Sequence, residues 1–285
     1  MNILTFDIEE WFHILDNKST KSVKSWANYE YRLDSNMDKI FELLDRNNQK
    51  ATFFCLGWVA RKFPHIVRRI DDLGYEIGTH SDIHQLAYEQ TRSAFKNDLN
   101  HSICSIENII GKKVKCYRAP GFSLTKKNLW VFEELLKQGI EVDCSVFPAN
   151  RSHGGLPSYN YSKPSLLNID GFELKEFPIN LFDFFNTNII FSGGGYFRLL
   201  PYSIIKTMMK QSDYVMTYFH PRDFDPQQPI INDLSLIRKF KSYVGLNSSL
   251  GKLENLIKDF DFVDLSQADD NIDWNNVKKI KIVSK

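Results

Sequence analysis

The sequence lacks an excess of charge of either sign. Its 285 residues include 36 Lys and Arg against 35 Asp and Glu, which leaves a formal net charge of +1. A protein that binds nucleic acid or anionic lipid over a broad surface is usually strongly basic. The composition therefore excludes nucleic acid as an expected partner and favours a compact, mostly neutral ligand.

Long hydrophobic runs are also missing. No apolar stretch approaches the length that spans a bilayer. The N-terminus shows no basic region followed by an apolar core and a small-residue cleavage site. These features predict a cytoplasmic protein without a transmembrane segment, and peripheral contact with the inner face of a membrane is left open.

Cysteine is scarce, and no two cysteines have the C-x-x-C spacing of a metal or redox motif. Three of the four lie in apolar stretches, where a reduced thiol packs as a small hydrophobic group. We expect all of them to be free and structural: Cys55, Cys104, Cys116 and Cys144.

Short apolar runs alternate with amphipathic segments along most of the chain. The pattern predicts strands at 2–8, 51–55, 75–79, 114–118, 140–145, 214–219 and 262–265, and helices at 34–49, 64–74, 91–111, 125–139 and 249–260. Such alternation predicts a parallel sheet, either open or closed into a barrel. We expect an irregular insertion with a hairpin at Asp170-Gly171 in residues 146–200, and a loosely held polar tail at 266–285.

The segment "HSDIH" places His80 and His84 four residues apart, directly after a predicted strand. On a helical turn this spacing puts both imidazoles on one face, within reach of a single cation. The pair is therefore a candidate for two ligands of a metal site. Two surface histidines at this spacing also occur by accident, so the pair alone does not decide.

The segment "LTFDIEEWFH", residues 4–13, carries Asp7, Glu9 and Glu10 in a run that otherwise resembles a buried strand. Burying a carboxylate without a partner costs several kcal/mol. In a strand Asp7 and Glu9 point to one side and Glu10 to the other. One carboxylate can complete a two-His, one-carboxylate metal site while another acts as a general base. The alternative is a solvated strand end that binds only lysines.

Further polar residues follow predicted strands. His220 in "MTYFHPRDFDP" comes after an apolar run, and Arg118 and Asp143 have the same placement. The carboxyl ends of parallel strands are where catalytic groups gather. These strand-end residues therefore favour a shared site. The remaining histidines have no matching partner and are predicted at the surface: His13, His65, His101 and His153.

The motifs follow an order that resembles a known family. The set "TFDIE", "HSDIH", "YRAPGF", "VDCSVFP" and "YFHPRDFDP" is similar to the five motifs of the polysaccharide deacetylases, the NodB-homology domain of carbohydrate esterase family 4. "SGGGYFRLLPY" and "HPRDFDPQQP" resemble the branch in bacterial exopolysaccharide and lipopolysaccharide gene clusters, including exosortase-associated deacetylases. The resemblance implies an α/β fold, a distorted (β/α)7 barrel over residues 1–265, followed by the tail.

The resemblance also implies hydrolysis of an N-acetyl group on an amino sugar, which gives a free amine and acetate. By matching positions, Asp7 is the catalytic base and His220 is the general acid. Arg118 then orients the base, and Asp143 supports the acid histidine. The family's metal-binding histidines match His80 and His84.

The sequence departs from the family at two positions. Most members have adjacent carboxylates, whereas Ile8 separates the first two here, so the carboxylate ligand is Glu9 or, less favoured by strand alternation, Glu10. The third motif usually carries an aromatic residue where Gly121 stands, with Phe122 following. We expect the Gly121 amide to donate to the oxyanion.

The expected cofactor is one divalent metal, zinc, and the expected substrate is an N-acetylated sugar in a glycan-assembly intermediate, which is lipid-linked, nucleotide-linked or an oligosaccharide. Aromatic faces for the sugar ring are Trp11, Phe122 and Tyr196. Two alternatives are a metal-free cyclic amidase of the purine-breakdown type and an inactive glycan-binding barrel. The His pair argues against the first, and the presence of Asp7 and His220 argues against the second.

Overall fold

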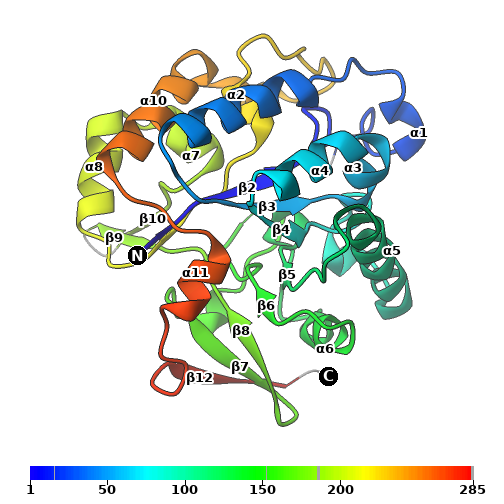
Figure 1. Cartoon of the computed structure of the whole chain (residues 1–285), viewed down its shortest axis with the longest axis vertical. Coiled ribbons are helices and arrows are strands. Elements are labelled where there is room, and N and C mark those ends of the chain that lie inside the picture. Colours follow the sequence, from blue (N-terminus) through cyan, green and yellow to red (C-terminus); the bar gives the residue numbers. More distant parts are fainter. Residues whose placement is uncertain (16, 152, 185–186, 284–285) are drawn as a thin grey trace.

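A curved, mostly parallel sheet forms the centre of the molecule (Figure 1). The computed structural model describes residues 1–15, 17–151, 153–184 and 187–283. Eight strands pair in the order β12-β7-β8-β6-β5-β4-β3-β2. Their bounds are β2 Thr5–Ile8, β3 Thr52–Cys55, β4 Glu76–Thr79, β5 Cys116–Tyr117, β6 Val142–Asp143, β7 Ser165–Ile169, β8 Phe172–Glu176 and β12 Lys278–Ile282.

The wall continues from β2 to the late strand β11 (Val215–Met216). The chain enters along β1 (Asn2–Ile3), which pairs in parallel with β11, and Phe6 then bridges Phe219. On the other side of β11 the contacts are single ones and not a ladder: Gly193 forms a parallel bridge with Tyr218, and the Met216 amide donates to Asn180 Oδ1 at 3.1 Å. The sheet therefore curves into a barrel-like wall with one irregular seam.

Helices cover the outside of this wall (Figure 1). The five predicted helices are present as α2, α4, α5, α6 and α10, because their apolar faces pack on the sheet, whereas the other helices were not predicted. Thr91 caps α5 by accepting from Ala94, and Gly111 ends it at a positive φ of 67°. The helices are α1 Val23–Trp26, α2 Leu33–Arg46, α3 Gly57–Lys62, α4 Pro64–Asp72, α5 Arg92–Ile110, α6 Trp130–Lys137, α7 Gly194–Leu199, α8 Tyr202–Lys210, α9 Leu236–Tyr243, α10 Leu246–Asp259 and α11 Leu265–Asp270.

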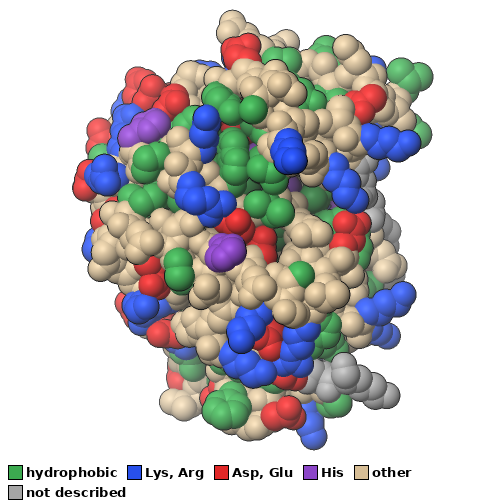
Figure 2. Space-filling view, turned by 90° about the vertical axis from the view of Figure 1, so that its right-hand side faces the viewer, with side chains coloured by type: hydrophobic (Ala, Val, Ile, Leu, Met, Phe, Trp, Pro, Cys, Tyr) green, Lys and Arg blue, Asp and Glu red, His purple; other side chains and the backbone are tan. Residues whose placement is uncertain are grey.

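Several predictions about the fold are confirmed. A hairpin turns at Asp170-Gly171, where β7 and β8 pair antiparallel. All four cysteines are free. None of the helices in the described chain has the length and hydrophobicity needed to cross a bilayer. On the face drawn in Figure 2, acidic and basic side chains are interspersed, in line with the balanced charge.

Other predictions need correction. The segment 262–265 makes only a bridge from Val263 to Ile3, because it lies beside the short first strand. The described part of 266–285 is not a loose tail, since α11 precedes β12 and β12 pairs in parallel with β7. Residues 146–200 are less irregular than expected. Their hairpin supplies β8, which pairs directly with β6, and a second hairpin joins β9 (Phe182–Phe184) to β10 (Thr187–Ile189). Residues 152, 185–186 and 284–285 lie outside the described residues.

Candidate active site

Polar side chains from distant strands meet at the carboxyl edge of the sheet. Asp7 lies on β2, His80 follows β4 and Arg118 follows β5. Backbone bonds fix the two residues beyond the strands, because the His80 amide donates to the Cys55 carbonyl at 2.9 Å and the Arg118 amide to the Thr79 carbonyl at 3.0 Å. His220, beyond β11, faces the same group. The predicted convergence of strand ends is therefore present.

Glu9, His80 and His84 form the candidate metal centre. Their ligand atoms all lie within 4.8 Å of one another, and the three side chains are buried or nearly so. Among the described residues no other group of three or more such side chains meets this criterion. Two imidazoles and one carboxylate are a donor set suited to zinc and similar divalent cations.

The hydrogen bonding of His80 prepares it as a ligand. Its Nδ1 lies 2.8 Å from the Arg118 carbonyl oxygen, which accepts only from a protonated Nδ1. Burial lowers the pKa of His80 to about 4, despite the opposing charge of Asp7. The imidazole is therefore neutral near pH 7, with the Nε2 lone pair left for a cation.

His84 reaches the site from an unusual backbone conformation. The segment "HSDIH" is not a helical turn as predicted, because Ser81 and His84 adopt positive φ values of 73° and 56°. Such conformations cost on the order of 1 kcal/mol or more for residues with a Cβ, and they concentrate at functional sites. Ser81 Oγ accepts from the His84 amide at 3.1 Å and stabilises the turn. The two histidines converge through this turn.

Glu9 completes the group. Its Oε2 lies 2.7 Å from His84 Nε2, yet it makes no hydrogen bond of acceptable geometry to any described residue. Burial alone raises the pKa of Glu9, but the imidazoles of His84, His220 and His13 lower it more, well below its usual range. An ionised carboxylate and an imidazole that approach closely without donor-acceptor alignment fit two ligands of one cation.

Asp7 and Arg118 form the second pair. Arg118 is fully buried, and its Nη1 donates to Asp7 Oδ1 at 2.8 Å and to Thr5 Oγ1 at 2.6 Å. The guanidinium also lies over the Phe54 ring, 4.3 Å from its centroid. The structure thus brings together the two residues predicted as base and orienting arginine.

His220 pairs with Asp223 and not with Asp143, so that sequence prediction is wrong. His220 Nδ1 lies 3.0 Å from Asp223 Oδ2, and Arg198 Nε lies 3.0 Å from Asp223 Oδ1. Burial alone lowers the pKa of His220, but Asp223, Glu9 and Asp7 raise it to about 9. His220 is therefore protonated near pH 7.

The partner of His220 lies in the same short motif. Residues 221–224 form a 3₁₀ turn, and Asp223 also accepts from the His220 backbone amide at 3.0 Å. This is the reciprocal pattern of a capping box. The three-residue spacing in "HPRD" is the signal that could have identified Asp223. No comparable signal in the sequence identifies Arg198, because its partner lies far along the chain.

Asp143 belongs to a different group. Its register partner on the neighbouring strand is Glu176, and both side chains are fully buried. Ser145 Oγ donates to Asp143 Oδ1 at 2.5 Å, and the Val146 amide donates to Glu176 Oε1 at 3.1 Å. Burial and mutual repulsion raise the pKa of Glu176, and burial raises that of Asp143 to about 6. The pair therefore shares a proton near pH 7.

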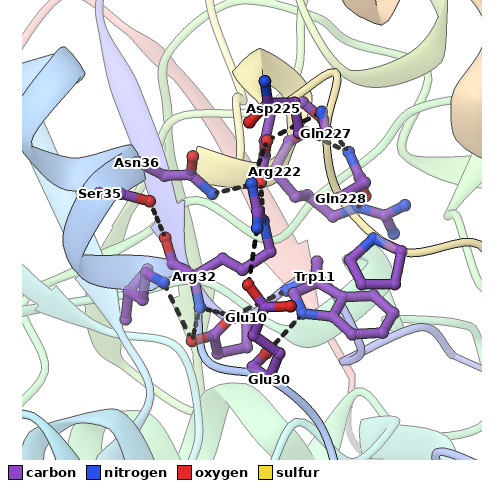
Figure 3. A network of polar contacts seen from close by, with 12 residues as sticks. Glu10, Trp11, Glu30, Arg32, Ser35, Asn36, Arg222, Asp225, Gln227 and Gln228 are labelled. Carbon is purple, nitrogen blue, oxygen red and sulfur yellow. Dashed lines mark hydrogen bonds and ion pairs between the residues drawn. The ribbon is translucent and has the colours of Figure 1, made fainter.

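Glu10 is not a metal ligand, and the alternative that named it is wrong (Figure 3). Its carboxylate accepts from the Arg32 amide at 2.9 Å and the Leu33 amide at 3.0 Å, at the start of α2. Arg32 in turn pairs with Asp225 through Nε and Nη2. Strand alternation had placed Glu10 on the opposite side from Glu9, and the structure agrees.

The three aromatic residues that were predicted to face the sugar ring differ in their exposure. Trp11 is buried, with its Nε1 donating to the Glu30 carbonyl at 2.8 Å, and Phe122 packs against Phe147 and Tyr218. Neither offers a free ring face, so their prediction as stacking residues is wrong. Tyr196 is 49% exposed at the start of α7.

Gly121 has a positive φ of 60°, and a Cβ there would lie 2.6 Å from Leu15 Cδ1. The positive φ favours glycine at this position, whereas Leu15 Cδ1 is the end of a flexible side chain that can move. The substrate-binding roles of Gly121 and Tyr196 stay predictions.

His13 was predicted at the surface, and this is wrong. It is buried, its ring lies 4.2 Å from the Trp26 centroid and 5.9 Å from that of His84, and Nδ1 accepts from the Glu10 amide. Burial lowers the pKa of His13 to about 3, so the ring is neutral. The aromatic residues around it are scattered along the sequence, which gave no signal for this packing.

Two family models match the chain in succession. Residues 16–139 match the polysaccharide deacetylase model, and residues 144–269 match a domain of unknown function, DUF3473. The first match contains His80, His84 and Arg118, and the second contains His220. Asp7 and Glu9 lie before both matches.

Curated relatives align with only part of the chain. A peptidoglycan-N-acetylglucosamine deacetylase of Bacillus cereus is 30% identical over 104 residues, which cover 36% of this chain and 38% of that protein. Chitin deacetylase 2 of Cryptococcus neoformans is 31% identical over 81 residues, which cover 28% of this chain and 18% of that protein. The chain thus matches well under half of each relative's length.

Solved structures match nearly the whole chain. A crystal structure described as a polysaccharide deacetylase from Mycobacterium smegmatis has a TM-score of 0.67 at 16% identity, over 99% of this chain and 93% of that one. A variant of a Bacillus anthracis pseudoenzyme of the same esterase family, with restored activity, has a TM-score of 0.50 at 13% identity, over 98% of this chain and 69% of that one. The predicted fold class is confirmed.

Proposed function

Residues 16–139 belong to the polysaccharide deacetylase family, and from this premise we propose that the chain is a metal-dependent hydrolase that removes the N-acetyl group of an amino sugar. The fold alone does not carry the proposal, because a pseudoenzyme shares it. The proposal rests on the side chains that line the site and on the protonation states that their surroundings favour.

One observation carries it. The candidate metal ligands, an ionised carboxylate and a protonated imidazole face one another around a single point. Asp7 Oδ2 lies 4.0 Å from His80 Nε2 and 3.8 Å from His220 Nε2. His220 Nε2 also lies 3.8 Å from Glu9 Oε1. A carboxylate base and a protonated imidazole beside a cation site are what amide hydrolysis requires.

The residues have separate tasks in this proposal. Glu9, His80 and His84 would hold a divalent cation, zinc in our proposal, which when bound would supply Lewis acidity towards an amide carbonyl and a water molecule. Asp7, held in place by Arg118, takes the proton of the attacking water. His220, held protonated by Asp223, donates a proton to the nitrogen of the leaving amine. The Gly121 amide is our candidate donor to the developing oxyanion.

The substrate follows from the same resemblance. The named relatives act on N-acetylglucosamine in peptidoglycan and on chitin, so an N-acetylated hexosamine is the proposed reacting unit. We further propose that it is part of an exopolysaccharide or O-antigen assembly intermediate, which is supported by the segments "SGGGYFRLLPY" and "HPRDFDPQQP". The carrier is nucleotide, lipid or oligosaccharide.

The first experiment is metal content by elemental analysis, with acetate release from N-acetyl sugars measured on the same samples. We expect about one divalent ion per chain, lost in the double variant His80→Ala, His84→Ala together with activity. A His101→Ala variant, on the exposed side of α5, should retain both and is the matched control.

The alternatives make different predictions for these samples. A protein that stays free of metal after incubation with zinc contradicts the metal site and favours a cyclic amidase. A protein that binds metal and N-acetyl sugars but releases no acetate from any of them favours a glycan-binding barrel.

A further inference from the structure

Helix α9 presents an apolar face that no described residue covers. Leu236, Ile237 and Phe240 are 84%, 69% and 58% exposed, and the helix buries none of its residues. Positions 236, 237 and 240 lie on one side of a helix. Large apolar side chains grouped in this way usually mark a contact surface.

The helix is held in place by contacts that leave this face free. Arg198 donates to three carbonyls at the end of α9, those of Lys241, Ser242 and Val244, at 2.9–3.0 Å. The Tyr243 hydroxyl accepts from the Ile231 amide at 2.9 Å. The apolar face is therefore displayed on an anchored helix.

The charge of this segment is one-sided, unlike that of the whole chain. Residues 234–252 contain Arg238, Lys239, Lys241 and Lys252 but no Asp or Glu. With about 100° between successive residues, Lys239 and Lys241 lie on the two flanks of the apolar face. Long basic side chains at such positions extend their charges to a water boundary while their stems cover apolar surface.

We propose that α9 docks on an anionic membrane surface, with Leu236, Ile237 and Phe240 in the boundary between headgroups and acyl chains. An apolar stripe flanked by lysines is the pattern of a helix that lies in this boundary. Anionic lipid headgroups complement the two lysines.

A second copy of the chain fits the same face less well. A two-fold contact through α9 would bring Lys239 and Lys241 of both copies together without acidic partners from this segment. Anionic lipid headgroups do not cause that repulsion, because their charge is opposite to that of Lys239 and Lys241. Many headgroups can also contact one helix.

The docking surface is linked to the candidate site through one side chain. Arg198 holds the end of α9 and also pairs with Asp223, the partner of His220. Docking through α9 would thus set the position of the site relative to the membrane. Membrane docking through α9 does not require enzymatic activity. Only the purpose of docking, which is to reach a sugar carried by a lipid, rests on the proposed function.

Vesicle co-sedimentation of the whole chain tests the proposal without substrate. The probes are vesicles of phosphatidylcholine alone and of an equal mixture with phosphatidylglycerol. We expect binding to the mixed vesicles, with roughly fivefold weaker binding for each lysine removed in Lys239→Gln, Lys241→Gln. The double variant Leu236→Ser, Phe240→Ser should weaken binding on the order of tenfold or more.

Two control variants carry the same types of substitution at exposed positions outside α9. Phe172→Ser removes a ring that is 70% exposed on the β7–β8 hairpin, which lies at the opposite end of the molecule from α7, α8 and α10 in Figure 1. Lys126→Gln, Lys127→Gln removes two exposed lysines before α6. Both variants should bind the mixed vesicles as the wild type does.

Three results would overturn the proposal. They are no binding to the mixed vesicles, equal binding to neutral vesicles in high salt, and equal losses in the control variants. A concentration-dependent dimer in size-exclusion chromatography that Leu236→Ser, Phe240→Ser abolishes would assign the face to a second copy instead. Acetate release from a soluble N-acetyl sugar, measured separately, keeps these outcomes distinct from failure of the proposed function.

Discussion

Two groups of buried carboxylates lie on the same sheet and are stabilised in opposite ways. Asp7 and Glu9 face Arg118 and imidazoles, whereas Asp143 and Glu176 face each other. The imidazoles lower the pKa of Glu9, and mutual repulsion with burial leaves a proton on the second pair. Burial alone therefore does not mark a catalytic carboxylate; the charge of its neighbours does.

The largest effect expected from this comparison is at Asp7. Replacing it by Asn removes the proton acceptor but keeps the shape, so turnover should fall about a thousandfold while bound metal is retained. Acetate release and elemental analysis on the same protein measure both. Glu176→Gln is the matched change in the other group and should leave turnover near the wild-type value. Equal losses in the two variants would show that the groups do not differ as described.

The next effect concerns the histidine that faces Asp7. In Asp223→Asn the pKa of His220 falls, because the carboxylate that raises it is gone. Since the acid must be protonated, the alkaline limb of the kcat/KM profile should move to lower pH by about one unit. Activity at pH 8 then drops by about twofold and at pH 10 by roughly tenfold, and it recovers at lower pH. An unshifted limb would contradict the pairing, and Asp143→Asn should leave the limb in place.

Glu10 lies next to Glu9, directly after β2, but it contacts the start of α2 and not the candidate metal centre. Glu10→Ala removes the acceptor for backbone amides at the start of α2, so the free energy of unfolding should fall by about 1–2 kcal/mol. Metal content should not change, since Glu10 lies away from the cation site. Denaturant unfolding and elemental analysis measure the two quantities. Glu9→Ala is the control, which should lose metal; loss of metal in Glu10→Ala instead would restore it as a ligand.

The smallest effect is expected at Glu176. Its pKa is raised in the folded state, so the folded protein holds a proton that the unfolded chain releases above about pH 4.5, and stability falls as pH rises. Glu176→Gln removes this dependence and should change the free energy of unfolding by less than about 1 kcal/mol at pH 6. Unfolding measured at pH 6 and pH 8 should show a smaller loss for the variant than for the wild type. An equal loss would place the shared proton elsewhere.

Short-range sequence patterns were sufficient to predict much of the fold and part of the candidate site. Strand alternation separated Glu10 from Asp7 and Glu9, although both family matches begin after these residues. The local pattern also predicted α5 and the hairpin turn at Asp170-Gly171. These features depend on neighbours within a few residues, which a sequence displays directly.

Long-range pairing was harder to predict. The partner of His220 was assigned to Asp143 because both follow strands, but the nearer Asp223 has the shorter path and the reciprocal cap. The polar composition of 266–285 concealed β12, which is stabilised by pairing with β7 and not by its own hydrophobicity. Trp11, Phe122 and His13 were misplaced because burial of an aromatic ring depends on side chains from several distant segments.

The pairing of β2 with the strand region around Phe219 has a consequence for biogenesis. The Thr5 amide donates to Thr217 Oγ1, although the two residues lie 212 positions apart in the sequence. The strand that carries Asp7 can therefore pair on this side only after most of the chain has been synthesised. A nascent or truncated chain that stops before β11 holds the histidine pair and an open strand edge but no acid. The candidate site is therefore complete only after the chain has been synthesised beyond β11.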